Sequence, residues 1–530
     1  MKKQKNGRFI VILLVCMSII LLSSLTFAGE PKYGGTLKIG ARFPQFHRMD
    51  IRYPTLETMA PANGMIYDRL FNWGPDGYKG LSPALGTSYE TKDNKNWIVH
   101  LRKGVKFHNG REMTAQDVKA NLDWRIKTPE KWKPVSYREL IKYLKAVEVL
   151  DDNTIKIILE KPYAPLMRVM AYAVKGIAAP EEVEKWGKKF LAHPCGTGPF
   201  KVVEIKPKEK VLLERFDGYW GPKPYVDRVE YLPIRSDAAR LIALQKGEVD
   251  IAWVFEEAYP VLKKDTSLEY QEGKSPLIMH KHYFNVRRWP MSDVRFRKAM
   301  WMGADWEKIC RNVRAFNKGA YARTFLEYTP YFNPEATKLV PKYNPGEAKK
   351  LIKAVEKDAG KKIPSVYWLD TSRSTGKKIA EPAKLQLAQI GVTLDLHLLD
   401  HTMWYTKLQK DPKLEWDMAG YGAGFGVDPS MGFRYFETDS GTGADGKALG
   451  GYSNPEFDKW IQKAEMAGNE KERMKAYHAA EMVLLKDVAA LPLVGYPMIV
   501  AYNKKIKGVK INNSCNIYVT NPYSNLWIDE

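Results

Sequence analysis

The sequence predicts an α/β fold with two or more domains, and three observations support this. Residues 237–247 predict a helix that starts after Ser236 and ends at Gly247, and a strand follows directly. Residues 363–398 predict strand, helix and strand, which is a βαβ unit with a right-handed crossover. The chain has 530 residues, 45% of them hydrophobic, which is enough for two or more domains with their own cores.

A strand–turn–helix pattern occupies residues 97–124. Apolar and polar residues alternate over 97–101, which predicts a strand, and 105–107 predict a short return strand. Asn109-Gly110 predicts a turn. Thr114 then suits the N-cap of a helix, and Asp117 lies near the positive end of its dipole. Nothing in this pattern is catalytic, so we interpret it as scaffold.

The first 28 residues have the pattern of an export signal. Basic residues at 2–8 precede an apolar run at 9–22, and Thr26-Phe27-Ala28 suits cleavage after Ala28. The run is short for a membrane span, although an uncleaved anchor is the alternative. Val15 stands before Cys16 where a lipoprotein needs a small residue. We therefore expect a periplasmic protein that is exported without a lipid anchor.

Charge and cysteine content narrow the classes of partner. The formal net charge is +22, but the lysines are dispersed and no nucleic-acid-binding motif is present, so we expect a solvated basic surface and no nucleic-acid partner.

We expect the mature protein to be a monomer. Cys195, Cys310 and Cys515 remain after cleavage, and any pair of them can form a disulfide.

No catalytic or cofactor motif is evident. The string Gly441-x-Gly443-x-x-Gly446 follows no strand and opens no helix, so it does not predict a dinucleotide site. We expect no enzyme activity, cofactor or metal, although a hydrolase with a spatially assembled site is an alternative. His397 and His401 are four residues apart, but His397 ends a predicted strand, so the pair should diverge.

Several stretches carry a resemblance to a known family. The run W-x-V-x-L-R-x-G-V-K-F-H-N-G-x-x-x-T-A-x-D-V at 97–118 closely resembles the family 5 bacterial extracellular solute-binding proteins. These are the peptide, nickel and oligosaccharide receptors of ABC importers. The stretches GGTLKIG at 34–40, GTGPF at 196–200 and RFDGYWG at 215–221 extend the resemblance over the mature chain.

The resemblance implies a domain plan. It implies a two-lobe periplasmic binding protein type II-like fold with an enlarged first lobe and a ligand cleft between the lobes. We expect lobe I at 29–279 with an inserted subdomain at roughly 76–200, lobe II at 280–500, and a return to lobe I at 501–530. The implied partners are a small-molecule solute and the permease subunits of an ABC transporter.

The resemblance also implies ligand-binding residues. Trp404 matches a family segment whose tryptophan borders the pocket, with core packing as the alternative. Phe43 lies in the loop after the first strand, which tends to face the cleft. His280 and His282 share one face of a predicted strand that ends at Asn285, so His282 and Asn285 are expected near the ligand. Plain surface residues are the alternative for the two histidines.

The loop between Asp417 and Asp428 departs from the peptide-binding pattern. Peptide receptors of this family carry an aspartate there that neutralises the α-ammonium of the ligand, and this chain has Phe425 instead. Burying an ammonium without a counter-charge is costly. Phe425 and Tyr421 instead offer faces for stacking, so we expect a small organic solute such as an oligosaccharide. A peptide receptor, a nickel or metal-complex receptor and a chaperone-like binding protein are the alternatives.

Overall fold

The structure is a computed structural model of the chain. It describes residues 30–42, 49, 51, 62–73, 80–127, 143–174, 176–254, 256–272, 279–313, 321–327, 329–372, 374–410, 413–423, 428–443, 445–495, 499–511 and 526–529. The expected signal, Phe43, Phe425 and Cys515 lie outside these residues.

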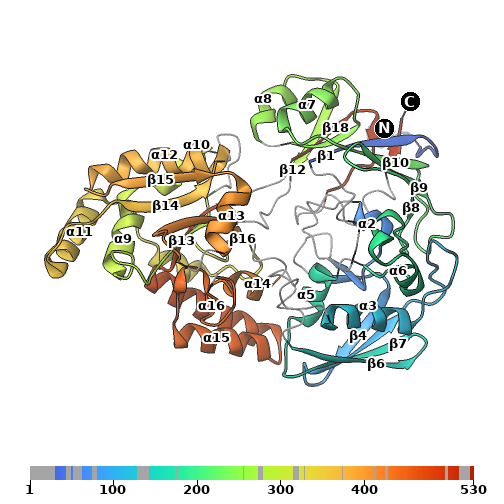
Figure 1. The fold of residues 1–530 in the computed structure, drawn as a ribbon, viewed down its shortest axis with the longest axis horizontal. Helices are drawn as coiled ribbons and strands as arrows, with labels where there is room; N and C mark the ends of the chain where they lie inside the picture. Colours follow the sequence, from blue (N-terminus) through green and yellow to red (C-terminus); the bar gives the residue numbers. More distant parts are fainter. Residues whose placement is uncertain are drawn as a thin grey trace, which may run out of the picture.

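Lobe I, on the upper right of Figure 1, is built on a seven-stranded sheet in the order β12-β18-β11-β1-β10-β9-β8. Its strands are β1 (Thr36–Ala41), β8 (Phe200–Lys206), β9 (Lys210–Arg215), β10 (Arg228–Pro233), β11 (Ile251–Val254), β12 (Leu268–Glu272) and β18 (Ile499–Asn503). Its helices include α2 (Asn63–Ile66), α6 (Pro180–Trp186), α7 (Asp237–Gln245) and α8 (Tyr259–Leu262). β1 pairs in parallel with β10 and β11, as an α/β sheet requires.

Lobe II, on the left of Figure 1, is built on a five-stranded sheet in the order β15-β14-β16-β13-β17. Its strands are β13 (Met279–Phe284), β14 (Val366–Thr371), β15 (Leu394–Leu399), β16 (Met418–Ala423) and β17 (Ala490–Gly495). Its helices are α9 (Val294–Gly303), α10 (Trp306–Val313), α11 (Pro345–Ala359), α12 (Ser374–Gln389), α13 (His401–Gln409), α14 (Ser430–Phe433), α15 (Pro455–Met466) and α16 (Glu470–Asp487). β14 and β15 pair in parallel around α12, so the predicted βαβ unit is confirmed.

An inserted subdomain lies below lobe I in Figure 1 and contains a four-stranded antiparallel sheet, β4-β5-β7-β6. Its elements are β4 (Gly86–Thr91), β5 (Asn96–Leu101), α3 (Ala115–Lys127), β6 (Leu144–Asp151), β7 (Thr154–Leu159) and α5 (Leu166–Ala173). Residues 105–107 do not form the predicted return strand along β5, which pairs with β4 and β7 instead. Lys106 forms only an isolated antiparallel bridge to Glu112. Val105 and Phe107 are buried in the core of this subdomain, which explains their apolar character.

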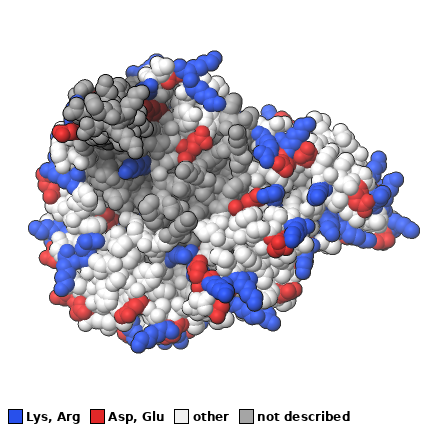
Figure 2. Space-filling model, turned by 180° about the vertical axis from the view of Figure 1, so that it is seen from behind, with Lys and Arg blue, Asp and Glu red and all other residues white. Residues whose placement is uncertain are grey.

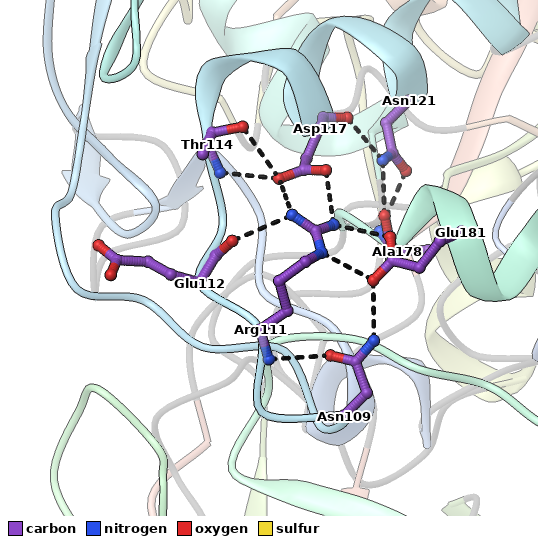
Figure 3. A network of polar contacts seen from close by, with 8 residues as sticks. All are labelled: Asn109, Arg111, Glu112, Thr114, Asp117, Asn121, Ala178 and Glu181. Atoms are coloured by element: carbon purple, nitrogen blue, oxygen red, sulfur yellow. Dashed lines mark hydrogen bonds and ion pairs between the residues drawn. The ribbon is translucent and has the colours of Figure 1, made fainter.

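A polar network joins the start of α3 to α6 (Figure 3). The guanidinium of Arg111 contacts the carboxylate of Asp117 at 2.7 Å and that of Glu181 at 2.7 Å. Asp117 also accepts the backbone N–H of Thr114 at 2.7 Å, and Asn109 donates to Glu181 at 2.8 Å. The network ties the turn before α3 to α6, which agrees with the scaffold interpretation of this motif.

Two glycines let the 196–200 turn lie directly against the chain at residues 65–66. A Cβ on Gly196 would lie 2.2 Å from the carbonyl oxygen of Ile66, and one on Gly198 would lie 2.3 Å from that of Met65. His108 also contacts the carbonyl oxygen of Gly198 through Nε2, at 3.0 Å. These contacts give the GTGPF stretch a packing role.

The inserted subdomain contacts lobe II at the end of α15. The carbonyl oxygen of Glu465 accepts the N–H of Ala164 at 2.7 Å, and that of Ala467 accepts Nδ2 of Asn94 at 3.1 Å. Met431 of α14 packs into the core of the inserted subdomain. A separate and exposed ion pair joins Lys378 of lobe II to Glu257 of lobe I at 2.9 Å.

Charged side chains are spread over the described surface. Figure 2 shows acidic residues interspersed among the lysines and arginines on the face it displays. Cys195 and Cys310 are both buried, and neither forms a disulfide with the other. Among the described residues, no helix combines the length and the apolar character that crossing a membrane requires.

Candidate functional site

Trp404 and Tyr421 lie against each other in lobe II. Trp404 is on α13, whose first N–H groups are capped by Asp400. The two rings stack with centroids 5.7 Å apart and an interplanar angle of 23°. Trp404 also donates from Nε1 to the carbonyl oxygen of Gly420 at 3.2 Å, and only 5% of the residue is exposed. Its burial favours a packing role behind Tyr421.

Tyr421 belongs to a group of tyrosines at the end of β16. Its ring centroid lies 5.3 Å from that of Tyr435 and 6.4 Å from that of Tyr283. Burial raises the pKa of Tyr421 well above its usual value, so the hydroxyl stays protonated. Tyr421 is half-buried and precedes Phe425 by four positions in the sequence. Tyr283 and Tyr435 are buried, so Tyr421 is the partly exposed ring of the three.

Asn285 has contacts within lobe II. Its Nδ2 donates to the carbonyl oxygens of Leu414 at 2.9 Å and Trp416 at 3.0 Å. Both bonds hold the segment that leads into β16 next to the end of β13. The side-chain nitrogen of Asn285 is therefore engaged by the chain itself.

Asp417 and Asp428, the acids on either side of residues 418–427, are also engaged. The carboxylate of Asp417 contacts Nε of Arg288 at 3.0 Å and accepts the N–H of Tyr367 at 2.8 Å. The carboxylate of Asp428 is fully buried and accepts the hydroxyl of Tyr477 at 2.5 Å. Each acid has a structural role that holds a strand or helix of lobe II.

His280, His282 and Asp370 converge inside lobe II. Both histidines lie on one face of β13, as the alternation of a strand requires. Their Nε2 atoms lie 3.2 Å apart, and they lie 3.2 and 3.1 Å from Oδ2 of Asp370 on β14. All three residues are buried, so the surface interpretation of the histidines is wrong. The sequence analysis missed Asp370.

Gly420 makes this convergence possible. β16 runs between β14 and β13 in the sheet, so the carboxylate of Asp370 must cross it. Gly420 is the β16 residue that pairs with His282. A side chain at this position would occupy the path of the carboxylate.

Burial and mutual contact set the charge of the cluster. Burial lowers the pKa of His282 to about 4, so its imidazole is neutral at ordinary pH. Burial alone would raise the pKa of Asp370, but the neighbouring imidazoles hold it below its usual value. The cluster thus combines an ionised carboxylate with a neutral imidazole at His282.

Other histidines do not form a comparable group within the described part of the chain. His397 pairs with Asp395 at 2.8 Å on the surface, and the described residues contain one cluster of three potential metal ligands, formed by His280, His282 and Asp370. His397 lies on β15, and His401 is the first residue of α13.

Comparison with known proteins decides the family. The sequence model of the bacterial extracellular solute-binding proteins, family 5 (middle region), matches residues 80–444, which is most of the chain. The chain belongs to this family. The resemblance drawn from the 97–118 motif is therefore confirmed, and the protein is a solute-binding receptor of the ABC importer type.

Known relatives of this family 5 receptor cover nearly its whole length. The glutathione-binding protein GsiB of Shigella dysenteriae is 26% identical over 512 residues, covering 93% of this chain and 95% of GsiB. The substrate-binding protein CtaP of Listeria monocytogenes has a TM-score of 0.80 at 22% identity, covering 94% and 100% of the two chains. NikZ of Campylobacter jejuni, solved with Ni(L-His), has a TM-score of 0.78 at 24% identity, covering 92% and 99%. The two structures confirm the two-lobe type II-like fold.

Proposed function

We propose that this receptor binds a small organic solute between its two lobes in the periplasm and delivers it unchanged to an ABC permease. The observation that carries the proposal is the family match over residues 80–444 on a fold of two sheets. The family match concerns binding proteins, which supports transport without catalysis.

The connections between the lobes support movement by closure. The chain passes from β12 to β13 and returns from β17 to β18. β12 and β18 are neighbours in lobe I, and β13 and β17 are neighbours in lobe II. The two crossings therefore lie side by side: in each lobe, the two strands that they connect are neighbours in the sheet. Paired crossings of this kind suit a hinge, around which lobes close on a ligand.

The engaged acids narrow the class of solute. The Asp417 carboxylate is paired with Arg288 at 3.0 Å, and that of Asp428 lies 3.7 Å from Arg473. Both charges already have a cationic partner, so neither acid is free to neutralise an α-ammonium bound beside residues 418–427. A peptide held at this loop would leave its ammonium without a counter-charge. We therefore favour a solute whose part beside the loop is uncharged.

Aromatic residues support the same class. We place the solute beside Tyr421 and Phe425, with His282, Asn285 and Phe43 as further candidate contacts or supports. The partly exposed ring of Tyr421 suits an apolar face of a sugar or a similar organic molecule, and Tyr435 packs beside it. Trp404 supports Tyr421 from behind through its stacking contact.

The first test is native mass spectrometry of the mature receptor purified gently from its own host, followed by extraction under denaturing conditions. A sugar or another organic molecule without an ammonium would support the proposal. A ladder of peptides, or glutathione, would show that the ammonium finds an acid outside the loop and would overturn the favoured class. Proteins that bind without any extractable small molecule would favour the chaperone-like alternative.

A second test changes the loop itself. Phe425→Asp introduces an acid where peptide receptors of the family carry one, and we expect it to gain affinity for short peptides in calorimetric titration. Phe425→Asn is the matched control, because it changes shape and polarity without adding charge. If both variants and the unaltered receptor bind peptides with equal affinity, Phe425 does not stand where peptide receptors of the family carry their aspartate.

A further inference from the structure

We propose that His280, His282 and Asp370 form a binding site for a divalent first-row transition-metal ion, separate from the transported solute. The three residues come from β13 and β14, and their side chains are almost completely buried. The site is defined by two imidazole nitrogens and one carboxylate oxygen that face a common point.

The distances fit a metal ion. The three atoms form a triangle with edges of 3.1 to 3.2 Å. An ion at about 2.0–2.1 Å from each ligand separates them by about 3.3–3.4 Å in tetrahedral and about 2.9 Å in octahedral geometry. The observed edges lie between these values. An ion can therefore enter with shifts of only a few tenths of an ångström, roughly the tolerance expected of a formed site.

The donor atoms select the class of ion. Imidazole nitrogen suits zinc, nickel, cobalt and iron, whereas calcium and magnesium prefer sites made of oxygen atoms. Three protein ligands leave a further coordination position open, as in many zinc sites. Zinc is therefore the first ion to test, with cobalt as its spectroscopic substitute.

Hydrogen bonds alone do not satisfy all three contacts among the two Nε2 atoms and Oδ2 of Asp370. Oδ2 of Asp370 can accept from both Nε2 atoms, but each Nε2 must then carry a proton, so neither nitrogen can accept from the other. The two nitrogens that carry these protons lie only 3.2 Å apart. A metal ion would accept a lone pair from all three atoms at once, so it satisfies the same geometry without opposing protons.

The surroundings hold the ligands in place. Oδ1 of Asp370 accepts the N–H of Thr371 at 2.6 Å, which fixes the carboxylate and leaves Oδ2 directed at the histidines. The rings of Trp306 and Trp368 lie 6.4 and 4.4 Å from the ring of His282 and form an apolar wall. An apolar shell around polar ligands strengthens metal coordination.

The location suggests a structural role for the ion. β13 is the first strand of lobe II after the crossing from lobe I, and its neighbour β16 separates it from β14. An ion held by both strands would fasten β13 to β14 across β16. It would therefore stabilise the end of lobe II that adjoins the crossing, whichever solute the receptor carries.

The test measures metal content and metal-dependent stability of the full mature chain. Protein purified without chelators, and protein refolded with one equivalent of zinc, are expected to contain one ion per chain by elemental mass spectrometry. Cobalt substitution is expected to give visible d–d absorption. Removal of the metal with a chelator is expected to lower the melting temperature.

Three variants assign the ion to this site. His280→Gln and Asp370→Asn each remove one ligand with little change in volume, and we expect both to lose the bound ion, with affinity falling roughly a hundredfold or more. His397→Gln is the control, because it removes a surface histidine that also pairs with an aspartate. It should retain one ion. Circular dichroism establishes that each variant is folded.

Three outcomes would overturn the proposal. The first is wild-type protein that holds no stoichiometric zinc, nickel or cobalt either as purified or after refolding with the ion. The second is folded His280→Gln and Asp370→Asn protein that retains the ion of the wild type, since the ion would then lie elsewhere. The third is a metal that binds only together with an added chelator, which would identify the metal as transported cargo.

Discussion

The carboxylate of Asp370 fills the space that a side chain at Gly420 would occupy. A Cβ on Gly420 would lie 2.1 Å from Oδ2 of Asp370. Because Gly420 pairs with His282 across the β13–β16 ladder, this bare position lets a β14 side chain contact a β13 side chain. The cluster in lobe II therefore depends on a glycine that is not one of its members.

We expect Gly420→Ala to displace Asp370 from the two histidines. Forcing an extra methyl group into a packed core typically costs about 1–3 kcal/mol, and we expect a loss of that size in the free energy of unfolding measured with urea. Gly346→Ala in α11 is the control, because the nearest atom to its Cβ would be 3.6 Å away. An equal effect of both variants would contradict the close approach at Gly420.

Trp404→Ala should lower stability strongly even without solute. The side chain is buried against Tyr421, and replacing such a tryptophan with alanine costs about 3–5 kcal/mol. Thermal unfolding of the solute-free receptor measures this loss. Tyr405→Ala is the control, because Tyr405 is exposed on the same helix and should matter less. Unchanged stability combined with lost solute binding would instead place Trp404 in the binding site.

Glu481 should make stability fall as the pH rises. Burial on α16 raises the pKa of Glu481 from 4.5 to about 8, although Oε1 accepts the N–H of Leu326. Between these two pH values the folded chain keeps a proton that the unfolded chain has released. The contribution of this group is therefore complete below pH 4.5 and is lost as the pH approaches 8.

The variant Glu481→Gln should flatten that dependence, because an amide keeps the neutral state at every pH. The slope it removes is at most about 1.4 kcal/mol per pH unit, measured by urea unfolding at several pH values. Glu472→Gln, at an exposed position of the same helix, should leave the profile unchanged. A wild-type profile that rises through this range, with no difference in Glu481→Gln, would rule out the buried proton.

Asp117→Ala should weaken the inserted subdomain and leave solute affinity unchanged. The variant removes the partner of Arg111 and of the Thr114 N–H at the start of α3, which should cost about 1–3 kcal/mol in unfolding free energy. Asp123→Ala is the control, since it removes only the pair with Lys119 on the same helix. A specific loss of solute binding in folded Asp117→Ala protein would contradict the scaffold role.

Local signals in the sequence predicted many elements accurately. Ser236 caps α7 by accepting the N–H of Ala239, as the sequence predicted. Gly247, which was predicted to end this helix, has a positive φ of 71° just after it. These features depend on side chains within a few residues of the helix end, so a single sequence contains the information.

Long-range contacts could not be predicted in this way. Asp370 is 90 residues from His280 and reaches it across a strand from a third part of the chain. The histidine alternation was visible, but the glycine that opens the path had the same appearance as its neighbours in a glycine-rich stretch. The 105–107 prediction failed for a related reason, because β5 found its partners in β4 and in the more distant β7.

The contact at Glu465 restricts how the two lobes can move. The paired crossings connect the lobes at one place, and the bond from Ala164 to Glu465 connects them at another, through the inserted subdomain. A rotation of one lobe that keeps both connections must turn about the line that joins them. The exposed ion pair between Lys378 and Glu257, worth about 0–1 kcal/mol, would add little resistance to such a rotation.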